Sequence, residues 1–173
     1  MGASTDSSLL QTIIVGVINM LFTIIAIFTV DRFGRKPLMI TGALIMSISM
    51  LSLGFSFYSG STGLSALVFM LLYIAGFAMS WGPVTWVLLS EIFPNSIRGA
   101  MSVPVATLWI SNLIVSWTFP MMNDNVWLTS KFNHGFSYWI YGIMCLAALF
   151  FVWKFIPETK GKSLEEIEKI WKK

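Results

Sequence analysis

The chain has 173 residues, of which 56% are hydrophobic and 11% are charged, and its formal net charge is +3. Soluble domains carry about 25% charged residues, so this composition excludes an ordinary water-soluble domain. The basic residues lie in short loops and at one end rather than on one helix face, which argues against nucleic-acid binding.

The first apolar segment covers residues 9–30 and contains no charged side chain. A helix of about 20 apolar residues crosses a hydrocarbon core about 30 Å thick, so this segment is the first predicted span. Thr12, Gly16, Asn19 and Thr23 recur along one face of it. Asn19 is the informative member, because an amide at membrane depth needs hydrogen-bond partners. It can find them on a neighbouring helix or on a ligand.

A short basic turn, residues 31–37 (DRFGRKP), separates the first span from the second, residues 38–58. Loops rich in Lys and Arg stay on the cytoplasmic side, so this turn is expected to face the cytoplasm. Ten of the eleven Lys and Arg residues then lie on that side, and only Lys131 lies outside. Five spans therefore predict an external N-terminus and a cytoplasmic C-terminus.

The third predicted span, residues 64–90, contains Gly82 and Pro83. Proline inside a helix removes a backbone hydrogen bond and kinks the helix. In transporters such discontinuous helices often mark the substrate site. Trp86 follows about one turn later, and its indole offers an apolar face and one N–H donor. This combination suits a sugar, whose C–H face stacks on aromatic rings.

The fourth span, residues 101–122, places Trp109 and Asn112 on one face, and the fifth, residues 136–156, is mostly apolar. The tail, residues 157–173, is expected to form a short amphipathic helix on the cytoplasmic side. The fold class predicted from these segments is an all-α membrane protein. Residues 1–156 would form a partial transmembrane bundle, followed by the tail.

The titratable residues do not suggest catalysis. There is one histidine, His134, in an external loop, and one cysteine, Cys145, in an apolar run. No paired carboxylates, metal-ligand spacing or phosphate-binding loop occurs, so we expect no enzyme activity, no metal and no cofactor. The carboxylates at the inner helix ends are expected to pair with nearby guanidinium groups; these are Asp31, Glu91 and Glu158 with Arg32, Arg35 or Arg98.

Four motifs carry a family resemblance: residues 31–37 (DRFGRKP), 82–86 (GPVTW), 90–99 (SEIFPNSIRG) and 157–161 (PETKG). In order and spacing they resemble the signature series of the sugar porter family of the major facilitator superfamily. The resemblance implies helices eight to twelve of a twelve-helix sugar–proton symporter in a bacterial inner membrane, with a xylose-like substrate.

The resemblance also implies two sets of site residues. The sugar-binding positions would be Asn19, Gly82, Trp86 and Trp109. The cytoplasmic charge network would be Asp31, Arg32, Arg35, Glu91, Arg98 and Glu158. The expected partners are a sugar, a proton, the lipid bilayer and an N-terminal half-transporter.

Two departures from the family pattern matter. Such transporters carry an amide before the tryptophan matched by Trp109, whereas this chain has Leu108, and the stretch 100–108 is one residue short. Losing that amide removes hydrogen bonds to a sugar hydroxyl. Helices one to seven are not in the chain, so we expect a fragment without transport activity alone. The alternatives are that the chain is one half of a split transporter or a non-transporting membrane partner. A pore formed by several copies of the chain would need a ring of charged residues, and the spans contain none.

Overall fold

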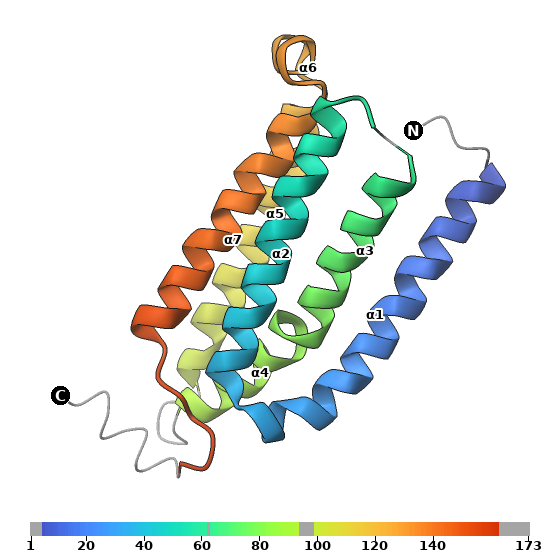
Figure 1. Ribbon diagram of the computed structural model, residues 1–173. Coiled ribbons are helices and arrows are strands. Elements are labelled where there is room, and N and C mark those ends of the chain that lie inside the picture. Colours follow the sequence, from blue (N-terminus) through green and yellow to red (C-terminus); the bar gives the residue numbers. More distant parts are fainter. Residues whose placement is uncertain (1–4, 62, 94–98, 163–173) are drawn as a thin grey trace.

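The computed structural model describes residues 5–61, 63–93 and 99–162, and within them every regular element is helical. The helices run in the order α1 (Thr5–Phe33), α2 (Arg35–Tyr58), α3 (Leu64–Met79), α4 (Trp81–Ile92), α5 (Ser102–Asn123), α6 (Val126–Phe132) and α7 (Gly135–Phe155) (Figure 1). When α3 and α4 are counted as one segment, five helical segments of the described chain are long and apolar enough to cross a membrane. The predicted all-α membrane fold is confirmed.

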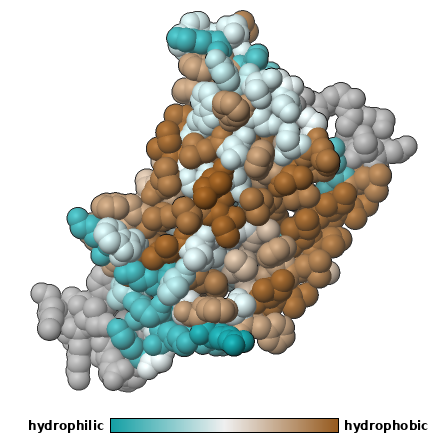
Figure 2. Space-filling model, viewed as in Figure 1, coloured by the Kyte–Doolittle hydropathy of each residue, from teal (hydrophilic) through white to brown (hydrophobic). Residues whose placement is uncertain are grey.

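The surface of the bundle is apolar between two polar ends. Figure 2 shows hydrophobic side chains over the middle of the visible face and hydrophilic ones toward its two ends. In the apolar stretch of α1 only 6% of residues are buried, and in that of α5 none is. Large side chains such as Phe28 and Trp117 are 75% and 70% exposed. Such surface is unfavourable in water but suits lipid.

Helix α2 lies at the centre and packs against α3 on one side and α7 on the other (Figure 1). The buried Ser47 hydroxyl donates to the carbonyl of Gly142 on α7 at 3.0 Å. Gly42 lets the α3–α4 junction approach closely, because a Cβ there would lie 1.7 Å from the Ser80 hydroxyl oxygen. Small residues at helix contacts serve the same purpose in other membrane bundles.

The third span breaks at Ser80, slightly before the predicted kink at Gly82 and Pro83. Pro83 lacks the N–H that would bond the carbonyl of Met79 four residues earlier, and its ring clashes with that carbonyl. Met79 is accordingly the last residue of α3, and α4 begins at Trp81. The proline therefore sits in the first turn of α4, where a missing N–H leaves no helix bond unmade.

Two connections differ from expectation. The basic turn at 31–37 is mostly helical, because α1 continues to Phe33 and only Gly34 separates it from α2. The connection after α5 contains the short helix α6, which the sequence did not predict. Helix α1 begins at Thr5, four residues before the predicted start of the first span. The remaining predicted span boundaries agree with the helix ends within one or two residues. The predicted tail helix lies in residues 163–173, outside the described residues.

Candidate functional site

Arg35 is the centre of a charge cluster where α1 meets α2; we define the cluster as Asp31, Arg35, Glu91, Glu158 and Lys160. The Arg35 Nη2 lies 2.7 Å from Glu91 Oε1, and its Nη1 lies 3.1 Å from Asp31 Oδ1. The side chains of Arg35 and Glu91 are 13% and 24% exposed, whereas that of Asp31 is 78% exposed. The Glu91 pair is therefore shielded from solvent, while the Asp31 pair contributes little.

Among the described residues, Glu158 binds the start of α2 and no guanidinium group. Its carboxylate accepts the backbone N–H of Arg35 at 3.0 Å and that of Lys36 at 3.1 Å. The first N–H groups of a helix have no partner within it and favour a negative charge. Gly34 makes room, because a Cβ there would lie 2.8 Å from Glu158 Oε2. This contact ties the segment after α7 to the junction of α1 and α2.

The sequence analysis did not assign Lys160 to this cluster, nor Thr159, which contacts it. Thr159 is 2% exposed, and its hydroxyl donates to Glu91 Oε2 at 2.6 Å. The Lys160 ammonium donates to the carbonyl of Arg32 at 2.7 Å. Both residues belong to the 157–161 motif, which was the available signal. Charge pairing alone could not identify Thr159, because its side chain is neutral.

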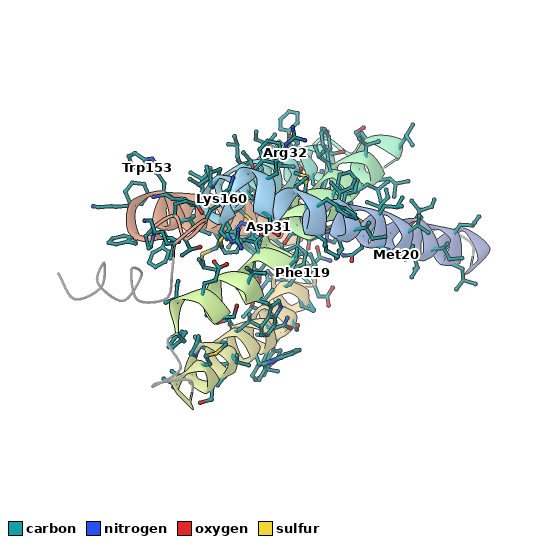
Figure 3. The ribbon with its side chains drawn as sticks, turned by 90° about the horizontal axis from the view of Figure 1, so that it is seen from below. Met20, Asp31, Arg32, Phe119, Trp153 and Lys160 are labelled. Atoms are coloured by element: carbon teal, nitrogen blue, oxygen red, sulfur yellow. The ribbon has the colours of Figure 1, made fainter. Side chains whose placement is uncertain are left out.

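The two remaining residues of the predicted network do not join it in the described part of the chain. Arg32 takes part only through its backbone carbonyl, and its exposed guanidinium makes no ion pair with a described residue. Figure 3, seen from the charged end, shows Lys160 and Asp31 near each other beside the start of α2. Arg98 lies outside the described residues.

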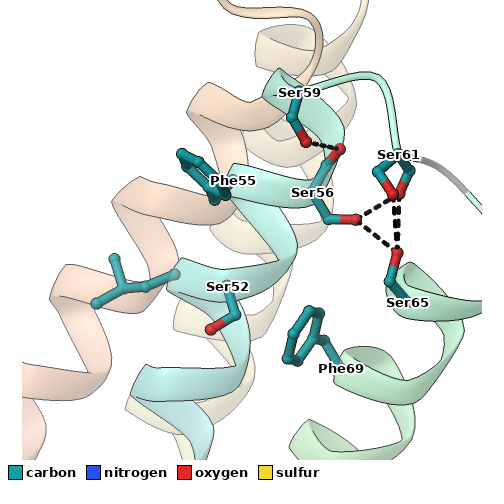
Figure 4. A pocket seen from close by; sticks show the side chains of 8 residues that line it. Ser52, Phe55, Ser56, Ser59, Ser61, Ser65 and Phe69 are labelled. Atoms are coloured by element: carbon teal, nitrogen blue, oxygen red, sulfur yellow. Dashed lines mark hydrogen bonds between the residues drawn. The ribbon is translucent and has the colours of Figure 1, made fainter.

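The predicted sugar-binding residues lie on three helices. Gly82 and Trp86 are in α4, just beyond the break, and the Trp86 side chain is 47% exposed. Asn19 is exposed on α1, and Trp109 is 61% exposed on α5. None of these residues lines the two cavities between α2, α3, α5 and α7 or the groove where α2 meets α3 (Figure 4). Asn19, Trp86 and Trp109 are exposed at the surface rather than enclosed in a site.

Two partly open cavities, of ≈ 270 and ≈ 320 Å³, lie between α2, α3, α5 and α7 and share Met50, Tyr73 and Phe119. Trp81 also lines the first, but its indole N–H already donates to the carbonyl of Met39 at 3.0 Å. Most of the lining is apolar and offers few hydrogen-bonding groups to a sugar. These cavities are therefore poor candidates for the sugar site.

The titratable groups away from the charged end form no catalytic arrangement in the described residues. The His134 ring Nδ1 lies 3.0 Å from the carbonyl oxygen of Asn123 in the turn before α7. Cys145 is a free, half-buried thiol on α7. No group of three His, Cys, Asp or Glu residues within the described ranges could hold a metal ion.

Comparison with known protein sequences gives consistent matches. The profile of the family described as sugar (and other) transporter matches residues 1–171. The chain is 64% identical over 172 residues to the D-xylose-proton symporter of Escherichia coli K12, covering 99% of this chain and 35% of that protein. It is 49% identical over 173 residues to the glucose facilitated diffusion protein of Zymomonas mobilis, covering 99% and 37%.

Comparison with solved structures gives the same result. The chain is similar to the proton:xylose symporter XylE bound to 6-bromo-6-deoxy-D-glucose, with a TM-score of 0.90 and 64% identity over 99% of this chain and 36% of that one. For the inward-open xylose transporter XylE from E. coli the TM-score is 0.87, with 62% identity over 95% and 36%. The chain thus spans 35 to 37% of the length of these relatives.

Proposed function

This chain belongs to the sugar (and other) transporter family, and we propose that it forms the C-terminal part of a sugar–proton symporter for a pentose such as xylose. The observation that carries the proposal is its 64% identity to a D-xylose-proton symporter, spread over 99% of the chain. The chain is a multi-pass helical membrane protein, with five helices suited to cross the bilayer. In the proposed transporter it supplies one wall of the sugar cavity and part of the gate at the charged end.

We propose that Asn19 on α1, Gly82 and Trp86 on α4, and Trp109 on α5 form one sugar-binding wall. Trp86 and Trp109 present large uncovered indoles, and Asn19 adds an amide with both donors and an acceptor. Indole faces bind the C–H face of a sugar, while amides bind its hydroxyls. A wall of this kind encloses a sugar only when a second half-bundle covers it, as alternating access requires.

Proton coupling needs a group from another part of the transporter. Among the described residues the carboxylates are Asp6, Asp31, Glu91, Asp124 and Glu158, all at helix ends or in connections. A carboxylate that titrates during transport is expected near the substrate, at membrane depth. The described part of this chain therefore contributes sugar contacts and gating contacts, and the partner half supplies the titrating group.

The charge cluster would lie at the cytoplasmic face, with the C-terminus on the same side. The bias of Lys and Arg toward that end supports this orientation. The shielded Arg35–Glu91 pair and the Glu158 contact hold α1, α2, α4 and the segment after α7 together. A gate built from such contacts opens when they separate.

Uptake of labelled xylose in a transport-deficient strain tests the proposal. The chain is expressed alone, together with a half-transporter comprising helices one to seven of a xylose symporter, or not at all. We expect uptake only from the pair, and we expect it to fall when the proton gradient is collapsed. Uptake by the chain alone, or none by a pair shown to be assembled in the membrane, would contradict the proposal.

A further inference from the structure

Helix α6 lies at the end of the bundle opposite the charge cluster (Figure 1). Two residues separate it from α5, which ends at Asn123, and two separate it from α7, which begins at Gly135. An extended chain covers at most about 3.6 Å per residue, so both ends of α6 lie within about 11 Å of a membrane span. Its Phe132 ring also packs on Phe136 and Trp139 in the first turns of α7. Since the headgroup layer is about 5 to 8 Å thick on each side of the hydrocarbon core, α6 lies at headgroup depth.

One side of α6 faces away from α5. The Thr129 hydroxyl donates to the carbonyl of Asn123 at 3.1 Å, so the Thr129 side faces the end of α5. Trp127 and Lys131 are each two residues from Thr129, which is about 200° of rotation in a helix. Both therefore lie on the opposite side, where the Trp127 side chain is 64% exposed and Lys131 is also exposed.

Lys131 gives this side a positive charge that no described carboxylate neutralises. Its Nζ lies 5.2 Å from the centre of the Trp127 ring and 5.6 Å from that of Phe132. Asp124 is the one acidic residue between α5 and α7, and no ion pair joins it to Lys131. The ammonium group is thus held between two rings and is free to donate to an anion. Aromatic rings and basic groups at this depth are typical contacts of lipid headgroups.

An exposed apolar stripe on α7 begins where α6 packs. Trp139 is followed at intervals of four, three and four residues by three exposed side chains, those of Ile143, Leu146 and Phe150. Residues at these intervals share one face of a helix. The stripe from Trp139 to Phe150 is about 16 Å long, close to half of the hydrocarbon core of about 30 Å. Its length therefore matches an acyl chain of one leaflet.

We propose that α6 and this stripe bind an anionic phospholipid of the leaflet at this end. The lipid places its phosphate on Lys131, its glycerol beside Trp127 and one chain along α7. One such molecule supplies a negative group at headgroup depth and an apolar chain below it, whereas a free phosphate would leave the stripe uncovered. Phosphatidylcholine binds less well, because its own ammonium group competes with Lys131 for the phosphate. The site lies apart from the proposed sugar-binding residues and does not depend on transport.

Quenching of tryptophan emission by brominated lipids tests the proposal on the full chain in vesicles. The chain has eight tryptophans, so the emission of Trp127 is taken as the difference between the chain and Trp127→Phe. We expect brominated phosphatidylglycerol to quench this emission at about one fifth of the mole fraction needed with brominated phosphatidylcholine, the factor that one basic residue contributes near anionic lipid. Emission quenched only by aqueous acrylamide would place α6 in water, and emission that neither quencher reaches would place it under a protein partner. Either result would overturn the proposal.

Two lysine variants locate the binding. Lys131→Gln removes the charge and leaves both rings in place, so it should abolish the preference for phosphatidylglycerol. Lys154→Gln is the matched control, because Lys154 also lies over two rings, those of Phe150 and Phe155, but at the other end of α7. It should retain the fivefold preference. Equal preferences of the two variants would refute the site.

Discussion

Replacing Gly34 by alanine should destabilise the charged end through two separate effects. Gly34 has φ 93° and ψ 163°, a region almost restricted to glycine, so a side chain there costs about 1 to 3 kcal/mol. The new Cβ would also lie 2.8 Å from Glu158 Oε2 and displace that carboxylate. Two partly exposed bonds to the N–H groups of Arg35 and Lys36 would then be lost, at about 1 kcal/mol each. The total is about 3 to 5 kcal/mol.

The assay is the unfolding free energy of the detergent-solubilised chain as dodecyl sulfate is added. Gly60→Ala is the matched control, because Gly60 has φ +74° but no neighbouring atom within 4 Å of its Cβ position. It should cost only the backbone term, about 1 to 2 kcal/mol. Adding Glu158→Ala to Gly34→Ala should cost little more, because the carboxylate contact is already lost. If Gly34→Ala costs no more than Gly60→Ala, the reasoning about Glu158 is refuted.

Glu91→Gln should lower the unfolding free energy by about 1 to 3 kcal/mol, because it removes the shielded negative charge that pairs with Arg35. Asp31→Asn should change it by under about 0.5 kcal/mol, because that pair is exposed. Equal effects in the same assay would contradict the burial argument. Gly42→Ala should lower the unfolding free energy by about 1 to 3 kcal/mol, because the new methyl group would overlap the Ser80 hydroxyl. Gly16→Ala is the control, because a Cβ there meets no atom within 4 Å, and it should leave the unfolding free energy unchanged. If Gly42→Ala does not lower it, the α3–α4 junction is loosely packed. Leu108→Gln restores an amide at this position, so it should tighten the binding of labelled xylose about three- to tenfold when the chain is assembled with an N-terminal half-transporter. An unchanged affinity would show that this position does not contact the sugar.

The spans were predictable because charge is so scarce between the helix ends. What the sequence could not reveal is where a helix stops when its end residues also suit a helix. Asp31, Arg32 and Phe33 continue α1, and only the backbone of Gly34 forces the chain to turn. Helix α6 has just seven residues, too few for a hydrophobic period. Its caps, Asn125 and the left-handed Asn133, were the available signals.

The site was predictable in part, because motifs name residues but not their geometry. The charges at 31–37 and 91 indicated ion pairing, but the central role of Arg35 required the structure. Glu158 was expected to pair with a guanidinium; in the described part of the chain its carboxylate accepts backbone N–H groups of α2. Backbone donors are invisible to a charge count. The sugar-binding role of Asn19, Gly82, Trp86 and Trp109 stays a prediction, since their wall is uncovered.

The most direct test of the account is equilibrium binding of labelled xylose to the chain assembled with its N-terminal half. Trp86→Ala removes the exposed indole of α4, whereas Trp117→Ala removes a still more exposed indole of α5 that is not among the proposed sugar-binding residues. The account predicts that Trp86→Ala weakens binding at least about tenfold, since stacking and one hydrogen bond are lost, and that Trp117→Ala leaves it unchanged. Equal affinities of the two variants would contradict it.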